Sequence, residues 1–209
     1  MVYLTIGTRT CSGFLVSVQH VITAADCVYG ASLSTITAYI GITELSNIND
    51  AVIRSISNVI IPASYSSYIN VADIAVLKLG ENVTLSSNIG LCCIDTDTSS
   101  PTIGTHGVIA GWGEVSLISS PSNSLRQAVV QVQNPSTCGL SSTNSGQFCT
   151  SYGTINTCST DNGGPFMTSR NNLWTCSGVI TGDISGCSRI TTYTKVSSFL
   201  TDINNALSQ

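Results

Sequence analysis

The segment "CSTDNGGPF", Cys158 to Phe166, has the composition of a tight catalytic loop. Two glycines and a proline follow a short acidic turn that begins at a cysteine, and such a bend is typical of loops that hold a nucleophile. The residue in the nucleophile's place is Asn162. Because a carboxamide does not attack carbonyl carbon, the segment predicts a loop that keeps the shape of a catalytic site without its reactive atom.

The composition indicates a folded all-β protein with few ionic partners. The 209 residues are 42% hydrophobic, which is sufficient for one large all-β domain or two small lobes with a real core. Only 9% are charged, the net charge is −4, and seven Lys and Arg residues are too few to neutralise a phosphate backbone. Nucleic acid and acidic membrane surfaces are therefore disfavoured as partners. No stretch approaches the apolar length that spans a bilayer.

The cysteines predict disulfides and hence a location outside the cytosol. There are nine, with no CxxC pair and only two histidines, which argues against a structural zinc site. The first residues lack the basic and apolar regions of a secretion signal, so we expect a mature or truncated secreted chain. Asn82 begins an N-x-T sequon and is a glycosylation candidate, although such tripeptides also occur by chance.

No metal or cofactor site is predicted from the remaining polar residues. Glu44, Asn47 and Asp50 are interpreted as a solvated loop rather than a calcium site, because they form no dense run of carboxylates. His20 and His106 are interpreted as turn or surface residues. The two tryptophans, Trp112 and Trp174, are interpreted as core or interlobe packing and not as a binding platform.

Ten short runs rich in Val, Ile, Thr and Tyr, with turn residues between them, predict strands of a barrel or sandwich. The runs are Val2–Ile6, Gly13–Val18, Ile36–Ile40, Ala51–Ile61, Ile74–Leu79, Gly107–Ala110, Arg126–Gln133, Phe166–Thr168, Trp174–Ile180 and Thr191–Val196. The polar stretch Asp95–Pro101 suits an exposed connection, so the expected lobes are 1–98 and 99–209. From Lys195 to Gln209 the apolar residues change to a helical period, which predicts a terminal helix docked on the barrels.

Three segments resemble, in order, the histidine, aspartate and serine segments of the chymotrypsin-like serine proteases. They are "CSGFLVSVQHVITAADC" (Cys11–Cys27), "VADIAVLKL" (Val71–Leu79) and the opening segment. Supporting matches are "GWG" (111–113), "QFCTSYG" (147–153), "SGC" (185–187) and "YTKV" (193–196). The resemblance covers nearly the whole chain and implies two six-stranded antiparallel β-barrels with a C-terminal helix.

The same resemblance implies that the catalytic machinery is degenerate. Asp26 stands at the position of the family's histidine and Asn162 at that of its serine, whereas Asp73 keeps the orienting carboxylate. Thr160 replaces the oxyanion glycine, whose backbone conformation is costly for a β-branched side chain. In active members a new N-terminal amine pairs with the aspartate that matches Asp161, and here we expect Asp161 to need another partner. The prediction is a chain with no functional catalytic residue, and so not an enzyme.

The substrate pocket is also expected to be occluded. The position at the base of the family's pocket is Asn156, so no buried charge awaits Lys or Arg. Thr181, Gly182 and Asp183 match the edge that pairs with substrate backbone, and Thr191 matches the glycine that keeps one wall open. The side chains of Asp183 and Thr191 would occupy the space of a substrate residue.

The family's disulfide framework implies three bridges, which are Cys11–Cys27, Cys138–Cys149 and Cys158–Cys187. The remaining cysteines are Cys92, Cys93 and Cys176. For these we expect one further bridge from Cys176 to either Cys92 or Cys93, with one free thiol.

Among inactive members of the family, the chain resembles the scabies mite inactivated protease paralogues, which are related to the mite group 3 allergen proteases. This resemblance implies a secreted protein that binds host proteins and interferes with host defence, complement components included; we expect a monomer. One alternative is a cryptic or residual hydrolase that uses Asp26 and Asp73 as a carboxylate pair. Another is a decoy that occupies protease substrates or inhibitors.

Overall fold

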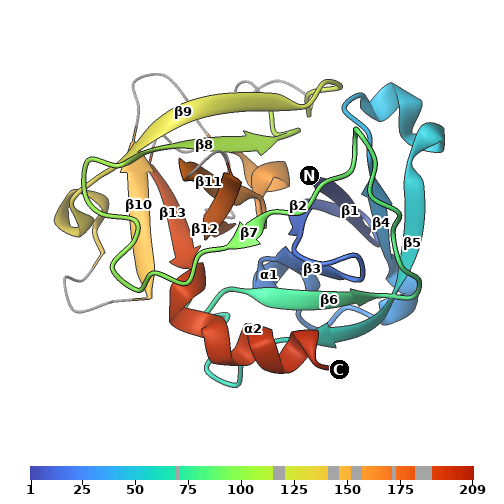
Figure 1. Ribbon diagram of the computed structural model, residues 1–209, viewed down its shortest axis with the longest axis horizontal. Helices are drawn as coiled ribbons and strands as arrows, with labels where there is room; N and C mark the ends of the chain where they lie inside the picture. The colour runs from blue at the N-terminus through green and yellow to red at the C-terminus, as the bar shows by residue number, and fades with distance from the viewer. Residues whose placement is uncertain (69–70, 115–120, 141–145, 152–156, 171–172, 182–189) are drawn as a thin grey trace.

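The computed structural model describes residues 1–68, 71–114, 121–140, 146–151, 157–170, 173–181 and 190–209. Its strands form two β-barrels that lie side by side (Figure 1). The strands are β1 Val2–Ile6, β2 Arg9–Leu15, β3 His20–Thr23, β4 Ile36–Ile40, β5 Val52–Ile60, β6 Ala75–Leu79, β7 Cys93–Ile94, β8 His106–Gly111, β9 Arg126–Val132, β10 Gln147–Ser151, β11 Pro165–Arg170, β12 Leu173–Thr181 and β13 Ile190–Lys195. The helices are α1 Ala25–Val28 and α2 Leu200–Leu207, with 3-10 turns η1 Leu33–Thr35, η2 Leu45–Asp50, η3 Pro135–Cys138, η4 Ser159–Asp161 and η5 Val196–Phe199.

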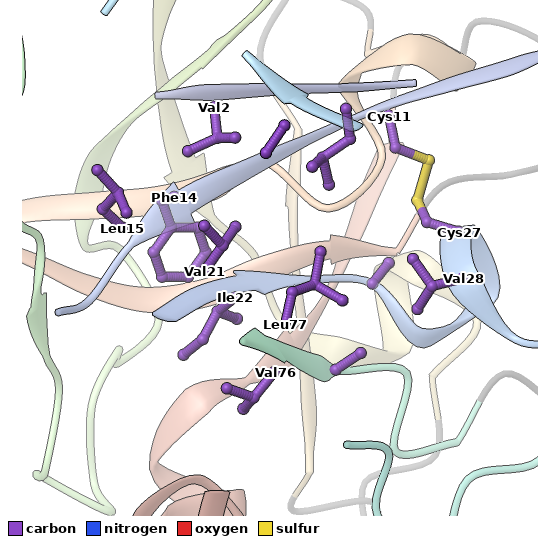
Figure 2. Close-up of a cluster of buried hydrophobic side chains, with 14 of the residues drawn as sticks. Val2, Cys11, Phe14, Leu15, Val21, Ile22, Cys27, Val28, Val76 and Leu77 are labelled. Atoms are coloured by element: carbon purple, nitrogen blue, oxygen red, sulfur yellow. A yellow bond between two sulfur atoms is a disulfide. The ribbon is translucent and has the colours of Figure 1, made fainter. Parts of the chain in front are cut away.

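The first barrel closes in the order β1-β2-β3-β6-β5-β4, with every neighbouring pair antiparallel. Its interior is filled by aliphatic and aromatic side chains, of which Val2, Phe14, Ile22 and Leu77 are shown in Figure 2. Valine and isoleucine favour strands because their branched side chains pack well on a pleated surface. Closure leaves this sheet without an unpaired edge.

The second barrel runs β11-β8-β9-β10-β13-β12 and closes through the pairing of β11 with β12. The short strand β7 adds in parallel to the outside of β12. The core is aromatic, with Phe148 stacked on Tyr193 at a centroid distance of 4.7 Å and Phe166 edge-on to Tyr193 at 5.4 Å. The fold class predicted from the sequence, two six-stranded antiparallel barrels with a C-terminal helix, is confirmed.

The C-terminal segment leaves the second barrel and packs on the first (Figure 1). Strand β13 leads into η5 and α2, and Val196, Ile203 and Ala206 join the core cluster of the first barrel. The apolar face predicted for this segment is therefore the buried face, and the segment ties the two barrels together. Within the described ranges, neither helix is long and apolar enough to cross a membrane.

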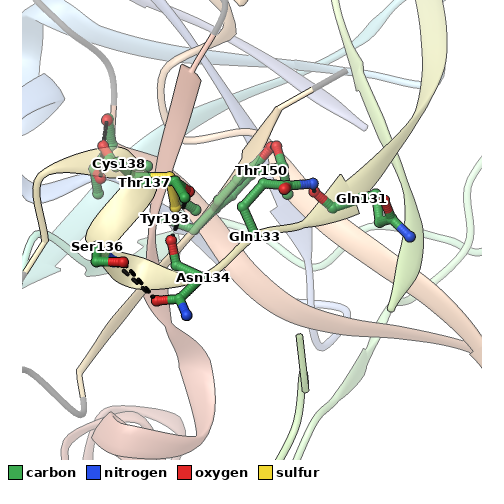
Figure 3. Close-up of a disulfide and its surroundings, with 11 residues drawn as sticks. Gln131, Gln133, Asn134, Ser136, Thr137, Cys138, Thr150 and Tyr193 are labelled. Atoms are coloured by element: carbon green, nitrogen blue, oxygen red, sulfur yellow. Dashed lines mark hydrogen bonds between the residues drawn. A yellow bond between two sulfur atoms is a disulfide. The ribbon is translucent and has the colours of Figure 1, made fainter. Parts of the chain in front are cut away.

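Three disulfides connect described cysteines. Cys11–Cys27 and Cys138–Cys149 form as expected (Figures 2 and 3). Cys176 bonds to Cys92, so this bridge joins the segment before β7 to β12 and the exposed Cys93 is left as a free thiol. The expected Cys158–Cys187 bridge cannot be placed, because residue 187 lies outside the described residues.

Candidate functional site

Asp73 is buried and lies two residues before β6, in contact with the segment that carries Asp26. Its Oδ1 accepts a hydrogen bond of 2.8 Å from the backbone amide of Asp26, and only 2% of the residue is exposed. Burial raises the pKa of Asp73 from 3.8 to about 6, although the backbone hydrogen bonds from Asp26 and Ala25 oppose this rise. The preceding residue, Ala72, has φ 55°, a conformation that costs energy in a residue with a Cβ atom. Asp73 is therefore fixed by surrounding structure rather than by an imidazole.

Asp26 lies in α1, and its side chain is about one-fifth exposed (21%). The carboxylate Oδ2 accepts a hydrogen bond of 3.1 Å from Nη2 of Arg9, which begins β2. The backbone amide of Asp26 thus contacts Asp73, and the side chain of Asp26 contacts Arg9. Arg9 was missed because it lies 17 residues away and nothing in the sequence marks it as a partner.

Asn162 follows η4 and is buried, with 6% of its surface exposed. Its carbonyl oxygen accepts a 2.8 Å hydrogen bond from the amide of Ser12 in β2. The next residue, Gly163, has φ +84°, and an added Cβ would lie 2.2 Å from Oγ1 of Thr23. The Sγ atom of Cys27 lies 3.8 Å from the Asn162 carbonyl oxygen. The structure therefore brings the opening segment against the segment that carries Asp26, as the resemblance implies.

Thr160 is buried within the 3-10 turn η4. Its carbonyl oxygen accepts a 3.0 Å hydrogen bond from Oγ of Ser12, and its own Oγ1 has no hydrogen-bond partner in the described part of the chain. Among the described non-glycine residues, Ala72 alone has a positive φ. Thr160 therefore does not adopt the left-handed backbone conformation that favours glycine. At Thr160 the loop forms a 3-10 turn, a backbone conformation that is open to a β-branched residue.

Asp161 is held by main-chain amides. Its Oδ1 accepts a hydrogen bond of 2.8 Å from the amide of Gly113, and its Oδ2 accepts one of 3.0 Å from the amide of Cys158. The fit is close, because a Cβ on Gly111 or Gly113 would lie 2.0 Å from a carboxylate oxygen. Burial raises the pKa of Asp161, whereas both amide hydrogen bonds lower it. These amides supply the hydrogen bonds that we expected Asp161 to need.

Two hydroxyl groups meet where the family's pocket would open. Oγ1 of Thr191 in β13 lies 2.7 Å from Oγ1 of Thr157, and both residues are buried. Thr157 directly follows Asn156, which the resemblance places at the pocket base, and Thr191 is the residue that the resemblance places in the pocket wall. Thr181 is also buried, and its carbonyl oxygen accepts from Thr192 Oγ1 at 2.9 Å. The other expected pocket residues, at positions 156, 182 and 183, lie outside the described residues.

The two histidines lie outside this site. His106 is exposed at the start of β8, as expected, but His20 is buried in β3, where its Nδ1 lies 2.8 Å from Ser17 Oγ. The surface interpretation of His20 was wrong because β3 is a fully buried strand of the first barrel. Burial, together with nearby Lys78, lowers the pKa of His20.

Other polar candidates are used in packing. Trp112 is fully buried and donates a hydrogen bond of 3.2 Å to the Thr43 carbonyl, as expected for a core residue. The packing interpretation of Trp174 was wrong, because it lies at the exposed beginning of β12 and is 50% exposed. Glu44 accepts hydrogen bonds from Asn123 and Ser124, which occupies its carboxylate. No group of three His, Cys, Asp or Glu side chains able to hold a metal occurs among the described residues.

The paired barrels and the meeting of three catalytic segments at their junction define the chymotrypsin class of fold. The trypsin family model matches residues 1–203, and the chain belongs to this family. It is 31% identical over 136 residues to trypsin alpha of Drosophila melanogaster, covering 65% of this chain and 52% of that protein. It is 36% identical over 121 residues to serine protease SP24D of Anopheles gambiae, covering 56% and 42%.

A further relative is trypsin theta of Drosophila melanogaster, 30% identical over 107 residues, with 51% of this chain and 39% of that protein covered. The matched region thus spans about half the length of these relatives, or less. Three disulfides and membership of the trypsin family are consistent with an extracellular location.

Proposed function

We propose that this protein is a proteolytically inactive member of the trypsin family that acts by binding another protein. The observation that carries the proposal is the buried Asn162 in the nucleophile's place, on a loop that is otherwise intact. A carboxamide nitrogen has its lone pair delocalised into the carbonyl group, so it offers no nucleophile for an acyl-enzyme. In a protease of another fold, loss of the serine or the histidine alone lowers kcat by roughly 10⁶-fold.

The surrounding contacts support this proposal. The general base would have to be Asp26, but its carboxylate is engaged in an ion pair with Arg9 at 3.1 Å. The contact between Thr157 and Thr191 places two threonine side chains against each other at positions that the resemblance assigns to the substrate pocket, which supports an occluded pocket. The same contact weighs against a decoy that takes substrates into the pocket.

A cryptic hydrolase would need Asp26 and Asp73 to share a proton or to activate water together. The observed geometry is different, because Asp73 accepts a hydrogen bond from the backbone amide of Asp26 and not from its carboxyl group. The pKa of about 6 at Asp73 is accounted for first by burial. We therefore keep this function as an outcome of the test and not as a second proposal.

The first test is turnover of a panel of peptide and ester substrates by the purified chain. We expect no hydrolysis above buffer, and also none from the double variant Asp26→His with Asn162→Ser, because Thr160 and the Thr157–Thr191 contact persist. Hydrolysis by the unmodified chain that is lost in Asp26→Ala would establish the cryptic enzyme instead. Substantial cleavage by the double variant would show that the pocket is open.

The second test concerns the partner. The resemblance to the inactivated mite paralogues implies a secreted protein that binds host defence proteins, complement components included. Immobilised chain is incubated with plasma, and bound proteins are identified by mass spectrometry against an immobilised active trypsin whose serine is blocked. Specific retention of a defence protein is expected. Retention of the same proteins on both columns would show that the binding is a general property of the fold.

A further inference from the structure

A surface cavity of about 520 Å³ lies on the second barrel, away from the candidate site. None of its lining residues belongs to the degenerate triad or the pocket described above. The walls come from the connection between the lobes, the end of β9, the start of β10 and the turn after β13. The volume is within the range of about 300 to 1,000 Å³ that is typical of small-ligand sites.

The cavity is lined by apolar residues and by polar residues. The apolar part consists of Pro101, Ile103, Val132, Pro135 and Phe148. Ile103 is 64% exposed although its neighbours in the cavity wall include the buried Phe148. An exposed aliphatic side chain at the edge of a hollow is a contact that a ligand's apolar group can cover.

The polar part of the lining includes the ammonium group of Lys195, which has no anionic partner among the described residues. Lys195 Nζ donates a 2.6 Å hydrogen bond to the carbonyl of Thr98, which also lines the cavity. In the described part of the chain no carboxylate oxygen lies within 4.0 Å of this nitrogen. An ammonium has three donors, so two more hydrogen bonds are available. Lys195 is half-buried, and a charge in such a place is normally paired.

Hydroxyl and amide groups complete the polar part of the lining. Ser197 is 5% exposed, and its Oγ has no hydrogen-bond partner among the described residues. Gln133 donates one hydrogen bond from its amide to the Gln131 carbonyl at 3.1 Å (Figure 3) and still has a second N–H. A buried polar group without a partner costs free energy that an oxygen-bearing ligand would recover.

We propose that this cavity, formed by Lys195, Ser197, Gln133 and Ile103, binds a carboxylate of a partner protein next to one of its apolar side chains. The ammonium and the hydroxyl supply donors to the carboxylate, and the wall around Ile103 covers the apolar side chain. The carboxylate belongs either to an acidic side chain or to a chain terminus, which share this chemistry. The proposal rests on the proposed function, because it names the surface with which the inactive chain binds.

The probes are three acetylated dipeptides, titrated into ¹⁵N-labelled chain and followed by amide chemical shifts. Acetyl-Leu-Glu-amide carries a side-chain carboxylate, acetyl-Ala-Leu carries a terminal carboxylate, and acetyl-Leu-Gln-amide carries neither. We expect saturable shifts at residues of the cavity with at least one of the first two peptides, and no saturation with the third. The stronger of the two identifies the source of the carboxylate. Equal binding of all three, or none with any, would overturn the proposal.

Two variants make the test specific. Lys195→Met removes the ammonium and should weaken binding about tenfold or more, since hydrogen bonds to charged groups are the strong ones. Lys78→Met is its control, because Lys78 is also a half-buried lysine and lies on the other barrel, where it donates to the main-chain oxygen of the last residue, Gln209. The control should leave the peptide affinity unchanged. An equal loss in both variants would mean that only net charge matters.

A second pair of variants tests the proposal in case the Lys195→Met variant does not fold. Ile103→Glu places a negative charge at the cavity edge and leaves Lys195 intact, so it should also weaken binding of the acidic peptide. Leu85→Glu, at another exposed aliphatic residue in the first lobe, is its control. These readouts are independent of catalysis.

Hydrolytic activity would refute the proposed function without affecting the proposed binding site. Unaltered peptide binding in Lys195→Met and Ile103→Glu would refute the proposed binding site alone.

Discussion

The buried carboxyl group of Asp73 should control how the stability of this protein depends on pH. Its pKa rises from 3.8 to about 6 on folding, chiefly because burial disfavours the charged form. At about 1.4 kcal/mol for each pKa unit, this corresponds to about 3 kcal/mol. The folded state binds a proton more tightly than the unfolded state, so ionised Asp73 destabilises the fold above pH 6. That destabilisation disappears as the pH falls through 6 towards 4.

Replacement Asp73→Asn removes this titration and keeps an acceptor oxygen for the amide of Asp26. Near pH 7.5 the variant avoids the cost of the buried charge but loses one charge-assisted hydrogen bond, which is worth about 1.5 to 3 kcal/mol. The net change in stability there should be small. The slope of stability against pH is the diagnostic quantity, because the unmodified chain should gain about 2.4 kcal/mol relative to the variant between pH 7.5 and 4.

Urea unfolding at intervals from pH 4 to 8, followed by tryptophan fluorescence, measures this difference. Asp161 is buried as well and its pKa is also raised, so the absolute curve of each chain contains a second contribution of the same sign. This contribution cancels in the comparison. Asp50→Asn, at an exposed carboxylate, is the control and should run parallel to the unmodified chain. Parallel curves for Asp73→Asn and the unmodified chain would refute the reasoning.

Two further predictions concern the loop and the free thiol. Gly163→Ala should destabilise the protein by about 2 kcal/mol or more, because the added Cβ meets Thr23 Oγ1 at 2.2 Å and φ is +84°. Gly104→Ala, with φ +86° and open space, isolates the backbone cost, which should be about 1 kcal/mol; equal unfolding midpoints would mean that the loop yields without strain. The native chain should release one equivalent of thionitrobenzoate on reaction with a disulfide reagent, and Cys93→Ser should abolish this release. Persistence of the release would place a second free thiol in the chain.

The local pattern was enough to predict most strands and the terminal segment. Runs such as Val2–Ile6 and Ile36–Ile40 became β1 and β4 with the expected bounds, because β-branched residues between turn residues have few other ways to pack. The strands β3 and β10 were not predicted as separate elements. Strand β3 is four residues long and buried throughout, so it has no alternation, and β10 contains Gln, Thr and Ser. Only pairing with neighbouring strands makes either of them a strand.

The cysteines show where sequence reasoning stops. Adjacent residues of a strand point to opposite faces, so only one of Cys92 and Cys93 can reach Cys176. In the register of β7 on β12, Cys93 pairs with Thr175 and Ile94 pairs with Cys176. The cysteine that forms the bridge to Cys176 is therefore Cys92. Nothing near these residues in the sequence contains that information.

The sequence by itself determined the family framework, the presence of Asn162 and Asp26 at the positions that the resemblance assigns to the family's serine and histidine, and the low charge. These are properties of residue type and order, which one chain displays directly. The tertiary structure decided the ion pair of Asp26 with Arg9, the contact of Thr157 with Thr191, and the cavity beside Lys195. Each of these joins residues 17, 34 or nearly 100 positions apart. Barrel closure and strand register create such contacts, and no local pattern encodes them.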